Sequence, residues 1–253
     1  FDVNGDIPAP ADPRVYVAQR LATLKDANGN VQPITSKPEL GKIKNYPVVF
    51  VGTGQLLGGD DLATTQTQSL YAIKDKLTNT DYGSPRPLLP IVATNFVAQT
   101  LTSGTCAAGN AFCVEDQAIV TSTNNTVDFT TKDGWYTDFP VAGERVNTDL
   151  RLQLGTLAFN TNTPKSGACV PVGVGYAYFL DYRTGGYVEG TSGMVGIKIG
   201  DFLVTSPSVI RLADGTIKEL IRTDAPGTTT LPVPTAPSPF DTRRISWREL
   251  VTE

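Results

Sequence analysis

The sequence of 253 residues contains no histidine. A Ser-His-Asp triad, a Cys-His pair and a zinc site with histidine ligands all need an imidazole side chain, so none of them can form here. Lysine, tyrosine and carboxylate side chains remain as acids and bases, but no spacing between them marks a catalytic group. The absence of histidine therefore excludes several common forms of nucleophilic and zinc-dependent catalysis.

Charge is also scarce in this chain. Only 18% of the residues are charged, the net charge is −4, and the basic residues are scattered along the sequence. Grooves that bind nucleic acids depend on clustered lysine and arginine, so we expect no nucleic-acid partner. No apolar run approaches the roughly 20 residues that span a bilayer, and we expect no membrane span. The chain begins at Phe1 without a methionine or a signal peptide, which we interpret as a processed or cut piece of a longer protein.

The chain has only three cysteines, and two of them lie close together. Cys106 and Cys113 bracket a glycine-containing loop between two expected strands. A disulfide between them suits a surface or periplasmic protein, and closing so short a loop contributes roughly 2–3 kcal/mol in the entropy model. We predict this disulfide, and the alternative is two free thiols in a reducing compartment. Cys169 is left over, either because its partner lies in a missing part of a longer chain or because it is a buried free thiol.

What the sequence has in plenty is glycine (24), proline (18) and threonine, a composition that favours an all-β class over helices. The most informative segment runs from residue 47 to residue 75. In it the apolar run Val48–Val51 predicts a strand buried on both faces, and Gly52-Thr53-Gly54 ends that strand. A phosphate loop would need a following Lys-Ser or Lys-Thr pair, so we expect these glycines to serve tight strand packing. After a polar excursion, Leu70–Ile73 predicts a second strand.

Other local signals extend the β pattern along the chain. Residues 150–160 alternate between apolar and polar positions and predict a further strand, and the only helix candidates are 62–67 and 242–251. Strands closed by aspartate-bearing turns recur at irregular separations, which average near the roughly 40–50 residues of a four-stranded blade. This pattern fits a propeller and a sandwich equally well. Tight turns are predicted near Asn28-Gly29, Asp133-Gly134 and Asp214-Gly215.

Five stretches of the sequence resemble, in the same order, the C-terminal β-propeller of the PilC/PilY family of type IV pilus tip-associated adhesin and biogenesis proteins. Together they span most of the chain, which matches roughly the last half of the family's propeller. The five stretches are Asp26 to Thr35, Val49 to Asp75, Gly134 to Val146, Leu154 to Phe159 and Arg243 to Leu250.

The resemblance implies that residues 1–253 form one all-β domain, a partial β-propeller of several antiparallel blades with few or no helices. It implies an extracellular bacterial protein at the cell surface and the pilus tip, which supports pilus biogenesis, surface attachment and twitching motility. Such a chain would be an interaction module and not an enzyme, with minor pilins and host or abiotic surfaces as partners. Two alternatives stay open: a propeller enzyme of the quinoprotein type, and a structural subunit that self-associates through open sheet edges.

One candidate metal site lies near the N-terminus. Asp2, Asn4 and Asp6 supply oxygen ligands at alternate positions, as the opening of a calcium loop does. Ile7 stands where such a loop needs glycine, and no closing bidentate glutamate follows. Calcium is therefore the one candidate cofactor, and we expect it to have little effect on the fold.

The C-terminal region divides into two parts. Residues 225–240 include five prolines and predict an extended linker. The following residues 243–250 alternate, with Ile245 and Trp247 on one face, and predict a strand that docks on a neighbouring blade or pairs with another copy. We expect Trp135 and Trp247 to fill gaps between blades, because large aromatic side chains at strand positions usually pack.

Overall fold

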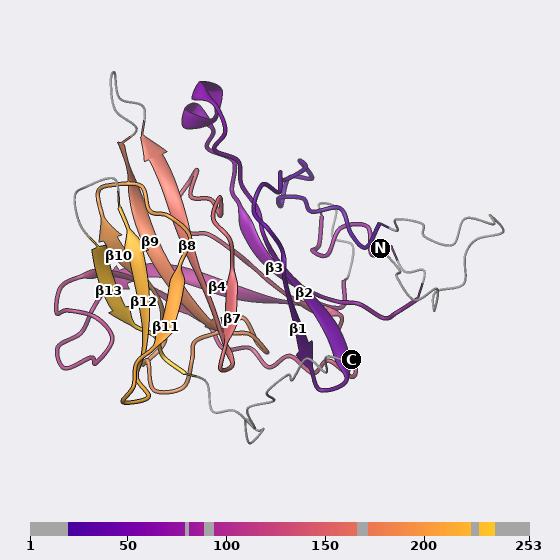
Figure 1. The fold of residues 1–253 in the computed structure, drawn as a ribbon. Coiled ribbons are helices and arrows are strands. Elements are labelled where there is room, and N and C mark those ends of the chain that lie inside the picture. Colours follow the sequence, from indigo (N-terminus) through magenta and orange to yellow (C-terminus); the bar gives the residue numbers. More distant parts are fainter. Residues whose placement is uncertain (1–19, 79–80, 89–93, 166–171, 224–227, 236–253) are drawn as a thin grey trace, which may run out of the picture.

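The computed structural model describes residues 20–78, 81–88, 94–165, 172–223 and 228–235, and in these residues the protein is almost entirely β (Figure 1). One short 3₁₀ helix, η1 (Gly59–Ala63), lies between the second and third strands. The strands are β1 (Glu39–Ile43), β2 (Tyr46–Gly52), β3 (Ser69–Lys74), β4 (Phe96–Thr105), β5 (Ala118–Ser122), β6 (Gly134–Asp138), β7 (Arg151–Gln153), β8 (Thr156–Lys165), β9 (Val172–Asp181), β10 (Met194–Gly200), β11 (Ser208–Arg211), β12 (Ile217–Arg222) and β13 (Thr228–Pro232).

The strands form two antiparallel groups of four, in the orders β1-β2-β3-β6 and β7-β8-β9-β10, and a separate sheet β11-β12-β13. Strand β4 joins the first two groups, because its residues 96–100 run parallel to β6 and its residues 101–105 pair with β5. Strand β5 then pairs with β10, so the ten strands make one continuous, mixed sheet. This architecture confirms the predicted all-β, partial β-propeller-like fold with few helices.

Burial on both faces explains the central strands of the first group. Along β3, Leu70 and Ala72 face one hydrophobic core, while Tyr71 and Ile73 face another on the opposite side of the sheet. All six residues of β3 are buried, as the run of apolar residues predicts. Strand β2 also contributes to both cores, with Val48 and Phe50 in the first and Val51 in the second.

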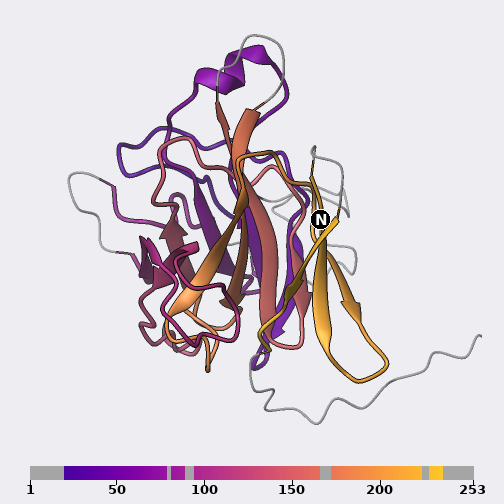
Figure 2. The same ribbon diagram turned by 90° about the vertical axis from the view of Figure 1, so that its left-hand side faces the viewer.

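Among the described residues, three hydrophobic cores hold the sheets together. The largest lies between the first and second groups of strands and contains Trp135, whose Nε1 donates a hydrogen bond of 3.1 Å to the carbonyl of Tyr182. Sheet β11-β12-β13 covers the opposite face of β8 and β9, where Ala158 and Phe179 meet Ile217 and Ile221 (Figures 1 and 2). Trp135 therefore fills the gap between the two groups of strands, as predicted.

Two parts of the predicted strand pattern are wrong. Residues 150–160 form a β7–β8 hairpin and not one strand, because Leu154 (φ 45°) and Gly155 (φ 79°) turn the chain in the left-handed region. Within the predicted linker 225–240, residues 228–232 form strand β13, which pairs in register with β12. The sequence predicted an extended linker without a pairing partner, and pairing with β12 makes part of this proline-rich segment a strand.

The turns are partly as predicted. A single antiparallel bridge between Lys25 and Val31 flanks the turn at Asn28-Gly29, and the β11–β12 hairpin turns at Asp214-Gly215. Near Asp133-Gly134 the turn comes earlier, at residues 128–132, and Gly134 already begins β6. The predicted helix at residues 62–67 is wrong: the 3₁₀ helix η1 ends at Ala63, and residues 64–67 are not helical.

Some predictions concern residues outside the described ranges. These are the calcium ligands Asp2, Asn4 and Asp6, the leftover Cys169, and the C-terminal strand with Trp247. Among the described residues, no helix is long and apolar enough to cross a membrane.

Candidate interaction surface

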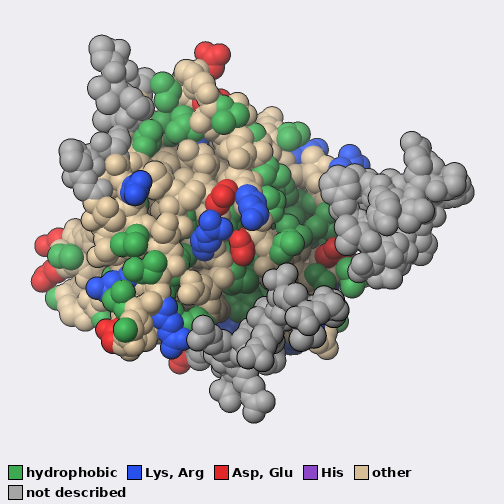
Figure 3. Space-filling view, viewed as in Figure 1, with side chains coloured by type: hydrophobic (Ala, Val, Ile, Leu, Met, Phe, Trp, Pro, Cys, Tyr) green, Lys and Arg blue, Asp and Glu red, His purple; other side chains and the backbone are tan. Residues whose placement is uncertain are grey.

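A loop between β2 and β3 projects from one end of the sheets, at the top of Figure 1. We call residues 55–64, which include η1, the Arg145 loop, because the side chain of Arg145 holds it in place. Leu57 is 77% exposed, and residues 58–60 are exposed as well. Figure 3 shows hydrophobic and acidic side chains together at this end of the molecule.

Arg145 is only 2% exposed, and its guanidinium group binds the loop from below. Nε donates to the carbonyl of Gly143, while the two terminal nitrogens donate to the carbonyls of Gln55, Asp61 and Thr64, each at 2.8 Å. Burial lowers the pKa of Arg145, and the nearby Asp61 carboxylate opposes that effect. Because four main-chain carbonyls accept from one planar group, the two ends of the loop are fixed relative to each other.

A second set of hydrogen bonds fixes the loop from within. The carboxylate of Asp61 accepts from the main-chain N–H groups of Leu57 (2.7 Å) and Gly58 (3.0 Å) and from Nε2 of Gln55 (3.0 Å). These bonds lower the pKa of Asp61. The N–H groups that a phosphate would need therefore already serve an internal carboxylate, which supports the prediction that this glycine-rich segment is not a phosphate loop.

The base of the loop is packed without space for side chains. A Cβ atom on Gly52 would lie 2.5 Å from Cβ of Val146, and one on Gly54 would lie 2.4 Å from Cβ of Arg145. Gly54 also has φ of 139°, a conformation that favours glycine. The expected tight packing at Gly52-Thr53-Gly54 is thus confirmed, and its partner is the segment that carries Arg145.

The residue beside Arg145 points into the core. Glu144 is fully buried, and its Oε1 accepts hydrogen bonds of 2.7 Å from the hydroxyls of Thr161 and Tyr178. Its Oε2 has no hydrogen-bond partner among the described residues. Burial raises the pKa of Glu144, which favours the neutral acid, and the two hydroxyl bonds offset part of that rise. Glu144 therefore ties the base of the loop to β8 and β9.

The N-terminal turn is connected to the same region. Asp26 accepts from the N–H groups of Asn28 and Asn30, both at 2.9 Å, so its carboxylate holds the turn, as predicted from Asn28-Gly29. Further along, the N–H of Gly54 donates to the carbonyl of Pro33 at 2.8 Å. The stretch 26–35 thus lies directly against the base of the Arg145 loop.

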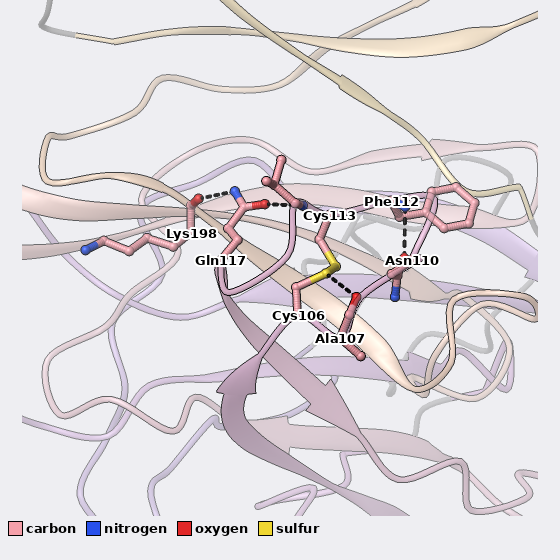
Figure 4. The surroundings of a disulfide bond; sticks show 8 residues. Cys106, Ala107, Asn110, Phe112, Cys113, Gln117 and Lys198 are labelled. Carbon is pink, nitrogen blue, oxygen red and sulfur yellow. Dashed lines mark hydrogen bonds between the residues drawn. A yellow bond between two sulfur atoms is a disulfide. The ribbon is translucent and has the colours of Figure 1, made fainter.

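The predicted disulfide is present on a different part of the surface (Figure 4). Cys106 and Cys113 are joined, with their Cα atoms 6.1 Å apart. Gln117 fixes the end of this loop, since its Nε2 donates to the carbonyl of Lys198 on β10 at 2.9 Å and its Oε1 accepts from the N–H of Val114. The disulfide therefore closes a loop that is anchored on the second group of strands.

Sequence reasoning marked the glycines of this site but missed the part played by Arg145 and Glu144. The signal that could have found them is the short segment Gly143 to Val146, which belongs to the stretches that carry the family resemblance. For metals, the described residues contain no group of three or more His, Cys, Asp or Glu side chains that could hold an ion. The candidate calcium ligands lie outside those residues.

Comparison with solved structures shows which known fold this chain is similar to. No protein-family model matches the chain, and no curated protein matches it. Among solved structures, the chain is similar to the crystal structure of the Pseudomonas aeruginosa PilY1 C-terminal domain, with a TM-score of 0.60 and 19% sequence identity. The match covers 84% of this chain and 47% of that one, so the chain spans about half the length of the domain it matches.

The class that the fold defines is therefore an all-β protein with propeller-like sheets. More particularly, the chain has the fold of about half of the PilY1 C-terminal domain, and this agrees with the resemblance found in the sequence. At 19% identity the comparison shows the fold, and what the chain does is argued below.

Proposed function

We propose that this chain is an interaction module of a type IV pilus-associated protein of the PilC/PilY kind, which acts at the pilus tip outside the cell and supports pilus assembly, attachment and twitching motility. The similarity of its fold to the PilY1 C-terminal domain supports the proposal. The five stretches of sequence that resemble the PilC/PilY family support it independently.

The observation that carries the proposal is the meeting of three of those stretches at one projecting loop. The Arg145 loop itself lies within residues 49–75, and residues 26–35 and 134–146 both contact its base. A rigid loop that presents an exposed leucine is suited to binding, because little conformational entropy is lost when a partner is engaged.

Binding rather than catalysis is also the role that the site's own chemistry favours. Three ionisable groups at the loop, Glu144, Arg145 and Asp61, are engaged in hydrogen bonds within the protein. A disulfide suits an oxidising compartment, which supports a location outside the cytoplasm. The proposed partners are minor pilins and the surfaces to which pili attach.

The test is a deletion with complementation in the bacterium that carries the gene. The reading frame that encodes this chain is deleted, and the strain is complemented with the wild type, with Leu57→Asp, or with Leu77→Asp. Leu77 is an exposed leucine outside the Arg145 loop and serves as the matched control. Pilin in the sheared surface fraction, twitching zones and attachment to glass are measured, with and without the pilus retraction motor.

The proposal predicts that the deletion lowers surface pili and twitching, that the wild type and Leu77→Asp restore both, and that Leu57→Asp does not. If assembly recovers when retraction is also removed, the protein opposes retraction. A deletion strain with normal pili, twitching and attachment would contradict the pilus function. Full complementation by Leu57→Asp would contradict only the assignment of the Arg145 loop.

A further inference from the structure

The third sheet has one strand fewer than the two groups beside it, in the part of the chain that the structure describes. The groups β1-β2-β3-β6 and β7-β8-β9-β10 have four strands each, whereas β11-β12-β13 has three. Strand β13 stands at one edge of this sheet, and its partner in the sheet is β12.

The hydrogen-bonding direction of the β13 edge can be read from one bond. The N–H of Val233 donates to the carbonyl of Ile217 at 3.1 Å, so the main-chain N–H and C=O groups of Val233 point toward β12. Because the direction alternates along a strand, Leu231 and Thr229 also face β12, and the N–H and C=O groups of Thr228 and Thr230 point away from it. Both of these threonines are exposed. The β13 edge thus offers a ladder of main-chain groups.

This edge carries few of the features that normally block strand addition. Residues 228–231 are Thr-Thr-Thr-Leu, with no charged side chain, and the register between β12 and β13 is continuous. Pro232, at the end of the strand, is the one residue of β13 that has no N–H to offer. By contrast, edge strand β1 carries Glu39 and Lys42, and its Gly41 lies against Leu152 of edge strand β7. Unprotected edges with β-forming residues favour pairing with a further strand.

The inner face of the third sheet also has apolar side chains at its margin that are only partly buried. Ile217, Ile221 and Val233 are buried against the second group of strands, while Leu231 and Val209 are only partly buried at the margin of this core. A fourth strand beside β13 would cover that margin if one of its faces were apolar and the other polar.

We propose that residues 243–250 of the same chain add to the outer edge of β13 as an antiparallel fourth strand, with Ile245 and Trp247 on the side of Leu231. Ten residues, 233–242, separate β13 from residues 243–250, which is enough for the chain to reverse and return beside β13. The alternation of residues 243–250 supplies one apolar and one polar face. This inference does not depend on the proposed function.

The protein's two tryptophans provide the readout. Full-length protein is labelled with 5-fluorotryptophan, and the Trp247 resonance is assigned with Trp247→Phe; the other resonance belongs to Trp135, which is fully buried. Broadening by a soluble gadolinium chelate reports the exposure of each ring. In the wild type, both resonances should resist broadening, whereas in urea both should broaden.

Thr230→Pro tests the edge itself. It removes an N–H that points away from β12, so the β12–β13 ladder keeps its bonds. The matched control is Arg211→Pro on the opposite edge, because Leu212 bonds to Thr216 and the N–H of Arg211 therefore points away from β12 too. We expect Thr230→Pro to expose Trp247 to the level seen in urea and to leave Trp135 protected, and Arg211→Pro to change neither.

Each other outcome overturns the proposal. A Trp247 resonance that broadens in the folded wild type shows that the segment does not dock. Protection that survives Thr230→Pro shows that it docks elsewhere. Sedimentation velocity tests whether the added strand comes from a second copy of the chain. A wild-type dimer that becomes monomeric in Thr230→Pro would show that it does.

Discussion

Replacing Glu219 by glutamine should make the protein more stable at alkaline pH while changing little at acidic pH. Glu219 lies on β12 between Ile217 and Ile221, is fully buried, and faces the second group of strands. Neither carboxyl oxygen reaches a hydrogen-bond partner among the described residues. Burial raises the pKa of Glu219 to about 8, and the neighbouring Asn160 amide offsets only part of this rise. The folded protein therefore holds a proton on this carboxyl that the unfolded chain releases near its ordinary pKa of 4.5.

The sign and size of the effect follow from linkage. Below about pH 4.5 the carboxyl is protonated in both states, so its contribution to stability is fully present. As the pH rises from there to about 8, only the unfolded chain loses the proton, and the free energy of unfolding falls by about 1.4 kcal/mol for each pH unit. The total is on the order of 5 kcal/mol, which structural relaxation around the charged group will reduce.

The assay is urea unfolding, followed by tryptophan fluorescence, of the wild type, Glu219→Gln and the exposed control Glu115→Gln. Glutamine stays neutral, so the stability difference between Glu219→Gln and the wild type should be small at about pH 5 and reach several kcal/mol at about pH 9. Glu144 is present in all three proteins and cancels from the comparison. A difference that stays constant with pH would refute the reasoning, as would an equal effect in Glu115→Gln.

Three further predictions concern the loops and the candidate metal site. Arg145→Lys should increase proteolysis and amide exchange within residues 55–64 more than it lowers the melting temperature, because one ammonium group cannot reach four carbonyls; unchanged exchange in the loop would contradict the anchoring role. Cys106→Ser together with Cys113→Ser should lower the free energy of unfolding by roughly 2–3 kcal/mol in urea titrations, and an unchanged midpoint would show that closing this loop contributes nothing. Millimolar calcium should barely change the melting temperature, and a marked rise that disappears in Asp6→Ala would mean that the N-terminal residues bind the ion.

The sequence predicted the central strands β2 and β3 and missed the edge strands β1 and β13, for a physical reason. Strands β2 and β3 are buried on both faces, so their composition alone identifies them. Strand β1 reads Glu-Leu-Gly-Lys-Ile, with Leu40 largely exposed, and β13 lies in a proline-rich segment. Both are strands because a neighbour offers them a hydrogen-bonding partner, and that information lies elsewhere in the chain.

The candidate site was predictable to a similar degree. The glycines at 52–54 announced close packing, because a turn with no room for Cβ leaves a local mark in the sequence. The role of Arg145 left no such mark, since three of its four acceptors belong to residues more than 80 positions earlier in the chain. The disulfide was predictable because its two cysteines are close in sequence, so a short loop alone brings them within reach.

The way Arg145 holds its loop has a consequence for how this protein can diversify. Its guanidinium group binds main-chain carbonyls, which every residue type possesses, so most side chains between 55 and 64 can be exchanged without loss of the anchor. The positions that constrain the shape are few, chiefly Asp61 and the glycines at the base. Different residues therefore determine the shape of the loop and the partner it binds. The exposed side chains of the loop can change as its partners change, while Arg145, Asp61 and the glycines keep its backbone conformation.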